Sequence, residues 1–278
     1  MKDSSGVASV ISLFRDDASL AEATVWLREA HLEGERAPLR AERLLDLLND
    51  GLLPDGLVAK HLDQDGMLIV EQAGQELPIE RLSDGYRAVT ALVFDLVYRI
   101  ATAHGPAAIE LDRSNGPITI DCPGVVLIDE AETHLHPSWQ RKLGFWLVEH
   151  FPNIQFIVTT HSPFICQAAA HGSLIRLSLP GDPRPPARLE GDDYWTVVNG
   201  SPNDAMLTEL FGLDRLISDE SEQLRETVAE LDVKQMDATL TPAEAEQLER
   251  ARARLPNQAS AELDRFRRLL EGMATKDG

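Results

Sequence analysis

Two acidic residues follow a short apolar run near the middle of the chain. Val125–Ile128 is continuously apolar, which is typical of a strand buried on both faces of a parallel sheet, and Asp129 and Glu130 come directly after it. They would lie at the carboxyl edge of the sheet, where open α/β sheets bind ligands. We expect Asp129 to hold Mg²⁺ and Glu130 to be the general base that activates water, with Glu132 as its nearest substitute.

A histidine follows the next apolar run. Ile154–Val158 predicts a second strand, and His161 comes just after it, before a Ser-Pro helix start. An imidazole at that edge can donate a hydrogen bond to a γ-phosphate and so sense it. Taken alone, such a histidine is more simply a core or surface residue, but the acidic pair one strand earlier favours the sensing role. Zinc binding by His134, His136 and His161 is disfavoured, because no Cys pair or His-Glu-x-x-His pattern accompanies them.

A third polar segment precedes a long predicted helix, Gly85–Ile100. Its sequence runs Leu-Ser-Asp-Gly-Tyr-Arg over residues 82–87. The free N–H groups and the positive dipole end of a helix start favour an anion, Gly85 lets the backbone approach it closely, and the Ser83 hydroxyl adds a donor. The simpler interpretation is an N-cap by Ser83 or Asp84, stabilising by about 1 kcal/mol, and the two are compatible.

The elements that would position these residues follow from apolar spacing. Helical spacing predicts a helix at Leu20–Ala30, after a capping box of Ser19 and Glu22, and another around Leu44–Leu48. Alternation then predicts two strands, Leu57–Leu62 and Met67–Gln72. The buried side of the helix Gly85–Ile100 is predicted to consist of Val89, Leu92, Val93, Leu96, Val97 and Ile100.

The second half of the chain continues the alternation of strand and helix. We expect a hairpin-like segment at Ala108–Ile120, a helix at Ser138–His150 and a third strand at Leu174–Leu179. The Pro-rich residues 180–186 would lead to a helical tail, with helix starts at Ser201-Pro202 and at Thr241-Pro242 followed by Glu244. This order indicates an α/β fold.

The three polar segments, in this order, resemble the signature loop, Walker B strand and switch histidine of the ABC class of P-loop ATPases. The run Glu-Ala-Glu-Thr-His-Leu-His-Pro over residues 130–137 is similar to the Walker B loop of bacterial OLD-like, SMC-related ATPases. The resemblance extends from about Ser9 to Gly212. It implies an incomplete ABC-ATPase head, that is, a partial P-loop NTPase-like parallel sheet flanked by helices, with a helical carboxy-terminal tail.

The resemblance also implies roles for individual residues, with ATP and Mg²⁺ as cofactors. Glu130 and His161 would be catalytic and Asp129 the Mg²⁺ ligand. The signature loop would contact the γ-phosphate of an ATP held by an opposite subunit, although Asp84 and Tyr86 depart from the Gly-Gly-Gln of transporters and resemble stand-alone bacterial ATPases. The residues implied to contact ATP are Ser83, Asp84, Gly85, Tyr86, Arg87 and, in the loop after Walker B, His136.

The sequence contains no Gly-x-x-x-x-Gly-Lys-Ser/Thr, the loop that cradles the α- and β-phosphates. The chain would therefore be one half of a split ATPase, a truncated product or a decayed relative. We expect three parts: residues 1–82 as a lid with helices and a β-meander, residues 83–180 as the half core, and residues 181–278 as linker and tail. A Walker A-bearing lobe or a homologous ATPase subunit would be the partner.

Composition restricts the other partners. The formal net charge of -20 argues against a surface that binds nucleic acid throughout. A local contact stays open, although the arginines between residues 250 and 268 alternate with acidic residues, as on a solvated helix face. Two cysteines, Cys122 and Cys166, give no disulfide framework, and no apolar run is long enough to span a membrane. We expect a cytoplasmic protein.

Leu210–Leu213 and the Glu-rich segment after it resemble the end of ATPases in phage-defence systems, in which a separate nuclease is the effector. The sequence thus predicts an ATPase half that acts in phage defence or another DNA-related process. The alternative is a catalytically inactive, ATPase-like module for interaction or dimerisation, in which the motifs are relics.

Overall fold

The computed structural model describes residues 38–54, 56–63, 66–109, 116–178, 181 and 183–255. The chain divides into two compact units, Met1–Leu213 and Asp214–Gly278. The helix predicted at Leu20–Ala30 and its capping box lie outside the described residues. The division into three parts, 1–82, 83–180 and 181–278, stays a prediction.

The first unit begins with a helix and a small antiparallel sheet. Helix α2 (Pro38–Asn49) is followed by β1 (Leu57–Leu62), β2 (Leu68–Gln72) and β3 (Gln75–Pro78), in the order β1-β2-β3. The predicted helix and strand pair are confirmed. The third strand was missed, because it has only four residues, begins with Gln and Glu and ends in proline. The sheet contacts α2, whose Leu44, Leu47 and Leu48 are buried in the core.

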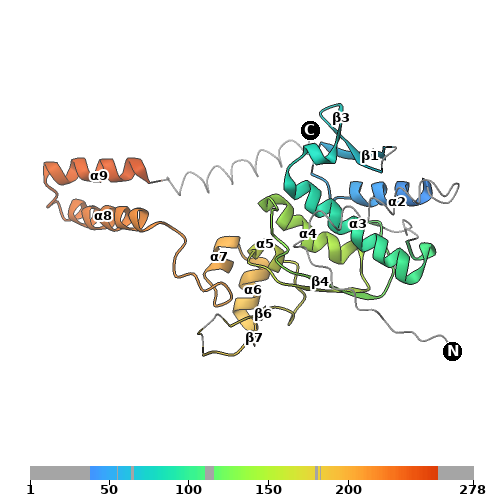
Figure 1. Ribbon diagram of the computed structural model, residues 1–278. Helices are drawn as coiled ribbons and strands as arrows, with labels where there is room; N and C mark the ends of the chain where they lie inside the picture. Colours follow the sequence, from blue (N-terminus) through green and yellow to red (C-terminus); the bar gives the residue numbers. More distant parts are fainter. Residues whose placement is uncertain are drawn as a thin grey trace, which may run out of the picture. The chain divides into compact units, whose positions relative to one another are not determined.

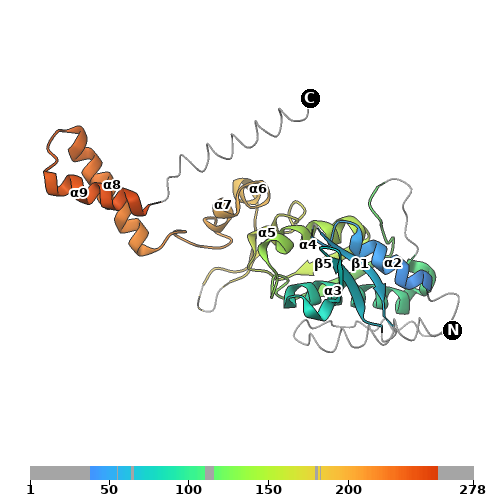
Figure 2. The ribbon, with the colours of Figure 1, turned by 90° about the horizontal axis from the view of Figure 1, so that it is seen from above.

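The long helix α3 (Asp84–His104) forms the centre of the first unit. All six side chains predicted for its buried side are buried. It lies beside α2 and α4 (Pro137–His150) (Figures 1 and 2). The Tyr86 ring of α3 meets the Trp139 ring of α4 edge to face, with 5.4 Å between the ring centroids. Short 3₁₀ turns, η1 (Ile79–Arg81) and η2 (Pro106–Ile109), flank α3. Residues 110–115, in the middle of the hairpin predicted at 108–120, lie outside the described residues.

The two strands predicted to carry the polar residues form a parallel pair. β4 (Gly124–Ile128) and β5 (Ile154–Val158) are in register from Gly124 opposite Ile154 to Ile128 opposite Val158, with α4 as the crossover between them. The helix after β5 is short, α5 (Pro163–Cys166). Helix and parallel strand therefore alternate here, and the α/β class is confirmed.

The prediction that these strands are buried on both faces is wrong. Val126 and Ile128 face the core, but on the other face Val125, Leu127 and Ile157 are 62%, 46% and 50% exposed. The register places Leu127 directly opposite Ile157, so these side chains form one apolar surface, which we call the open sheet face. A run of apolar residues therefore does not show which faces of a strand are covered, because that depends on which segments pack against them.

The third predicted strand does not join this sheet. Ile175 and Arg176 form β6 (Ile175–Arg176), which pairs antiparallel with β7 (Ala187–Arg188). Helices α6 (Gly191–Asn199) and α7 (Pro202–Met206) complete a second, smaller core around Tyr194 and Val197. The predicted helix start at Ser201-Pro202 is confirmed by a capping box.

The second unit is a helical hairpin of α8 (Asp219–Met236) and α9 (Pro242–Arg254). The predicted start of α9 is confirmed: Thr241 and Glu244 form a reciprocal capping box before Pro242. Within the described part of the chain, no helix combines the length and apolar character needed to cross a membrane.

Candidate functional site

The edge formed by the ends of β4 and β5 is held together by backbone and side-chain hydrogen bonds. The parallel ladder continues one step beyond the strands, where the Thr159 N–H donates to the Ile128 carbonyl, 2.9 Å, and the Ala131 N–H donates to the Thr159 carbonyl, 3.1 Å. The sequence prediction that both strand ends lie at one edge is therefore confirmed. Thr159 occupies the centre of this edge.

Thr159 joins the two acidic residues. Its hydroxyl donates to Asp129 Oδ1, and the same oxygen accepts the Glu130 N–H at 2.8 Å. Asp129 is exposed. A carboxylate beside a hydroxyl is the hard-oxygen donor set that suits Mg²⁺, which takes few protein ligands together with water and phosphate oxygens. The residues present therefore fit the cation expected from the sequence.

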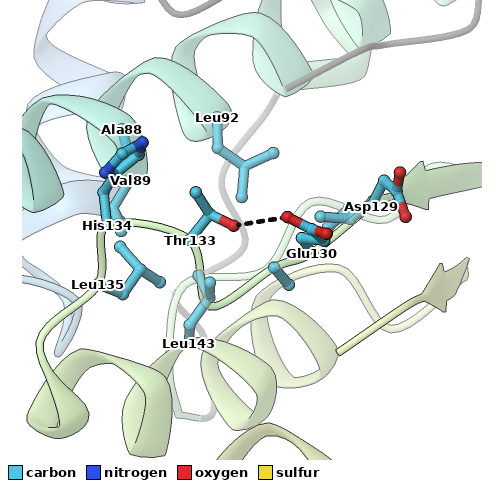
Figure 3. A pocket seen from close by; sticks show the side chains of 11 residues that line it. Ala88, Val89, Leu92, Asp129, Glu130, Thr133, His134, Leu135 and Leu143 are labelled. Atoms are coloured by element: carbon cyan, nitrogen blue, oxygen red, sulfur yellow. Dashed lines mark hydrogen bonds between the residues drawn. The ribbon is translucent and has the colours of Figure 1, made fainter. Parts of the chain in front are cut away.

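Glu130 has an unusual backbone conformation. Its φ of 48° lies in the left-handed region, which non-glycine residues adopt mainly where neighbouring contacts impose it. Here the Thr159 oxygen holds its N–H, and its own carbonyl accepts the Thr133 N–H at 2.9 Å. Figure 3 shows that the Glu130 and Asp129 carboxylates consequently point away from each other. Consecutive residues can thus serve different partners.

The Glu130 side chain borders a small cavity between α3 and the loop after β4 (Figure 3). The cavity volume is about 50 Å³, and the Thr133 hydroxyl donates to Glu130 Oε2 at 3.3 Å on its border. A water molecule needs about 10–15 Å³ in this measure and two or more polar partners. The cavity has the room, and Glu130 and Thr133 supply the partners. The apolar part of its lining consists mainly of Ala88, Val89, Leu92, Leu135 and Leu143.

Glu132, the alternative base, is already occupied by the neighbouring loop. One of its oxygens accepts the Thr160 hydroxyl and the other accepts the His161 N–H, both at 2.5 Å. Both oxygens therefore already have a donor within the protein, whereas one oxygen of Glu130 is bonded only to Thr133. This geometry favours Glu130 over Glu132 as the base.

The histidines of the predicted site have separate surroundings. His161 is exposed at the end of β5, with its backbone tied to Glu132. His136 is the N-cap of α4, where its Nδ1 accepts the Ser138 N–H at 3.3 Å. His134 has a φ of 63° and borders the cavity. Among the described residues no group of three His, Cys, Asp or Glu side chains could hold a metal ion.

The predicted signature loop lies against the loop after β4. A Cβ on Gly85 would lie 2.8 Å from the His134 carbonyl oxygen, closer than real Cβ contacts. Gly85 therefore allows a close backbone approach, as predicted, but the observed neighbour is this carbonyl. Tyr86 packs on Trp139, and Arg87 is paired with Asp84.

Ser83 is the N-cap residue of α3 by position, but its side chain makes no capping hydrogen bond, and it is exposed. The simple capping interpretation of the Ser83 hydroxyl is therefore wrong in this structure. The Ser83 side chain therefore leaves the first-turn N–H groups of this 21-residue helix uncapped.

Sequence reasoning did not single out Thr159, Thr160 or Gln140. A signal was present: two consecutive threonines end the second parallel strand, opposite the acidic residues that end the first. Parallel register places such positions side by side, so the pair could have been assigned to the same edge.

Comparison with known proteins identifies the family. Residues 12–167, more than half of the chain, match the family model described as "AAA domain, putative AbiEii toxin, Type IV TA system". The chain belongs to this AAA-domain family. The match includes the signature loop, the acidic pair and His161, so the AAA/ABC-type resemblance expected from the sequence is confirmed.

Two curated relatives are similar to this AAA-domain chain over part of their own length. Retron Ec83 probable ATPase of Escherichia coli is 41% identical over 99 residues, which are 36% of this chain and 17% of that protein. Septu protein PtuA of Bacillus thuringiensis is 30% identical over 194 residues, 66% of this chain and 45% of that protein. The chain spans less than half the length of these relatives.

Solved structures give a weaker likeness. An SMC ATPase chain, from work on ATP-driven dimerization and DNA-stimulated activation, has a TM-score of 0.39 and 20% identity, covering 60% of this chain and 89% of that one. The Smc head domain of Pyrococcus furiosus, bound to the C-terminal domain of ScpA, has a TM-score of 0.37 and 18% identity, with coverage of 64% and 51%.

Proposed function

We propose that this AAA-domain chain supplies the Walker B, switch-histidine and signature parts of an ATP site that a Walker A-bearing lobe or homologous ATPase subunit completes. The observation that carries the proposal is the shared edge of β4 and β5. There Thr159 is hydrogen-bonded to Asp129 and Glu130, and Glu132 is hydrogen-bonded to His161, across about 30 residues of sequence.

Each residue has a distinct task in this proposal. Asp129 holds Mg²⁺, which when bound neutralises charge on the nucleotide phosphates. Glu130 accepts a proton from a water molecule positioned next to it. His161 donates a hydrogen bond to the γ-phosphate, and Ser83 with the first turn of α3 approaches a γ-phosphate held by the partner.

The open sheet face supports the need for a partner lobe. Parallel sheets of α/β proteins are covered on both faces, because their strands are apolar on both sides. Here Val125, Leu127 and Ile157 are largely exposed next to the proposed site. A lobe that covers them would bring its phosphate-binding loop to the same sheet edge. The relatives are longer than the matched region, so such a lobe can come from another part of a related polypeptide.

The biological setting is also part of the proposal. The retron and Septu relatives support a role in phage defence. We infer that ATP use in this role controls a separate nuclease effector. DNA contact would then be made mainly through that effector, in keeping with the net charge of -20.

Glu130→Gln in the complex with the Walker A-bearing lobe tests the assignment of the base. The substitution keeps size and hydrogen bonding but removes the proton acceptor, so ATP hydrolysis should fall by about 10²-fold or more while ATP binding persists. Glu149→Gln, an exposed glutamate on α4, is the matched control and should leave turnover unchanged. Unchanged turnover in Glu130→Gln would contradict the assignment. Association without any ATP hydrolysis by the unsubstituted complex would favour the inactive interaction module.

A further inference from the structure

Glu132 connects the loop after β4 to the loop after β5. Its two carboxylate oxygens accept the Thr160 hydroxyl and the His161 N–H, each at 2.5 Å. These partners lie 28 and 29 residues away along the chain. Hydrogen bonds to a carboxylate are roughly twice as strong as those between neutral groups. The backbone of the proposed γ-phosphate sensor is therefore held by the loop that carries the proposed base.

A ring of hydrogen bonds extends this connection to the start of α4. The Thr160 oxygen accepts the Ser162 N–H at 3.0 Å, and the Ser162 hydroxyl donates to Gln140 Oε1 at 2.7 Å. Gln140 Nε2 donates to the Leu135 carbonyl at 2.9 Å. The Leu135 N–H returns to the Glu132 carbonyl at 2.9 Å, which closes the ring. Each polar group in the ring therefore fixes the next.

The ring is sheltered from water. Ser162 is 3% exposed, and Glu132, Thr160 and Gln140 are half-buried. Burial, and after it the negative charge of Glu132, raises the pKa of the nearby Cys166 thiol to about 12. A carboxylate in such surroundings interacts more strongly with its donors than it would in bulk water. The hydrogen bonds of Glu132 should therefore hold the two loops together more strongly than an exposed ion pair would.

We propose that Glu132 is a positioning residue that sets His161 relative to Glu130, so that phosphate sensing and water activation are coupled through one side chain. The inference rests on the proposed ATP site. Glu132 touches neither water nor phosphate in this proposal; it acts through the His161 backbone. Loss of the side chain should therefore impair the chemical step and spare nucleotide affinity.

Two variants and a control test this coupling. Glu132→Ala removes both acceptors, whereas Glu132→Gln keeps one carbonyl oxygen for the His161 N–H and should act as the conservative rescue. Glu71→Ala is the matched control, because Glu71 is a paired glutamate on β2 whose partner, Lys60, lies 2.8 Å away outside the site. Thermal melts show whether each variant is folded.

The first readout uses the chain alone and needs no ATP hydrolysis. Amide hydrogen exchange of the peptide containing residues 159–163 should be about 10-fold faster or more in Glu132→Ala, less affected in Glu132→Gln and unchanged in Glu71→Ala. Unchanged exchange in a folded Glu132→Ala variant would overturn the coupling, whether or not the chain takes part in an ATPase.

The second readout uses the complex with the Walker A-bearing lobe. We expect kcat to fall by about 10- to 100-fold in Glu132→Ala, as for other supporting residues, with KM for ATP changed by less than about threefold and kcat partly restored in Glu132→Gln. A KM effect without a kcat effect would overturn the positioning role. A different result would contradict the proposed function alone: faster exchange in the Glu132→Ala chain, together with no ATP hydrolysis by the unsubstituted complex. Glu132 would then still hold the two loops together, but not as part of an ATPase.

Discussion

The edge of the β4–β5 sheet and the α8–α9 hairpin are stabilised in different ways. At the edge, polar groups from segments about 30 residues apart satisfy one another next to a large core. In the hairpin, Leu231, Leu248 and Ala251 are the buried apolar side chains among the described residues of α8 and α9. Around them lie ion pairs at the surface, such as Arg250 with Glu246 within α9 and Arg252 with Asp232 between the two helices at 2.7 Å.

This difference indicates which contacts each region can lose. Exposed ion pairs contribute typically up to about 1 kcal/mol each and are weakened by salt. Half-buried hydrogen bonds to a carboxylate contribute more, and breaking one leaves a buried group unsatisfied. Small geometric changes should therefore disturb the sheet edge, whereas the hairpin should depend on its few apolar contacts and on its helix caps.

The largest expected effect on stability is in the hairpin, at Leu248. Its side chain is 1% exposed, so Leu248→Ala should destabilise the hairpin by about 2–5 kcal/mol. Amide hydrogen exchange of peptides from α8 and α9 measures this loss directly. Val233→Ala, at a position 58% exposed, should exchange like the unsubstituted chain. Equal effects of the two substitutions would show that the hairpin does not depend on an apolar core of its own.

A smaller effect is expected at Gly85, in the sheet-edge region. Gly85→Ala adds a Cβ 2.8 Å from the His134 carbonyl oxygen, and because both are backbone positions the loop must shift. Overpacking of this kind costs about 1–3 kcal/mol and should lower Tm by several degrees. Gly124→Ala is the control, since its nearest contact would be an ordinary 3.8 Å to the Ile154 side chain. Similar melting curves for both variants would contradict the close approach of the two loops.

The smallest effect concerns the cap of α9. Lys234, followed by the N–H and hydroxyl of Thr241, lowers the pKa of Glu244 to about 2, from an ordinary value of 4.5. The folded state therefore favours the carboxylate, and its contribution is present above pH 4.5 and lost as the pH falls towards 2. Helicity of the hairpin should decrease over this range. In Glu244→Gln this part of the acid transition should disappear, whereas Glu246→Gln should retain it.

The sequence was sufficient to predict those features of the structure that depend on neighbouring residues. The buried side of α3 and the capping box of Thr241 were predicted correctly, because helix period and cap chemistry are properties of neighbouring residues. The common edge of the two strand ends was also predicted correctly, from the expectation that the strands are parallel.

The sequence was insufficient where structure depends on distant partners. Nothing near Leu127 reveals that its side of the sheet is exposed, because that depends on which segment packs there. Likewise, the neighbour of Gly85 is a carbonyl about 50 residues away, and Ile175 pairs with a two-residue strand that has no periodicity. The hydrogen bonds of Glu132 are of the same kind: their partners follow from the parallel register and not from the local sequence.

The central claim is that this chain contributes half of an ATP site. Its most direct test is Mg²⁺-dependent ATP hydrolysis, measured for the pure 278-residue chain, for a Walker A-bearing lobe alone and for the two together. Because positioning and charge stabilisation of the β- and γ-phosphates supply most of phosphoryl-transfer catalysis, neither part should hydrolyse ATP above background, and the combination should. Robust turnover by the pure chain, or a combination that associates but stays inactive, would contradict the claim.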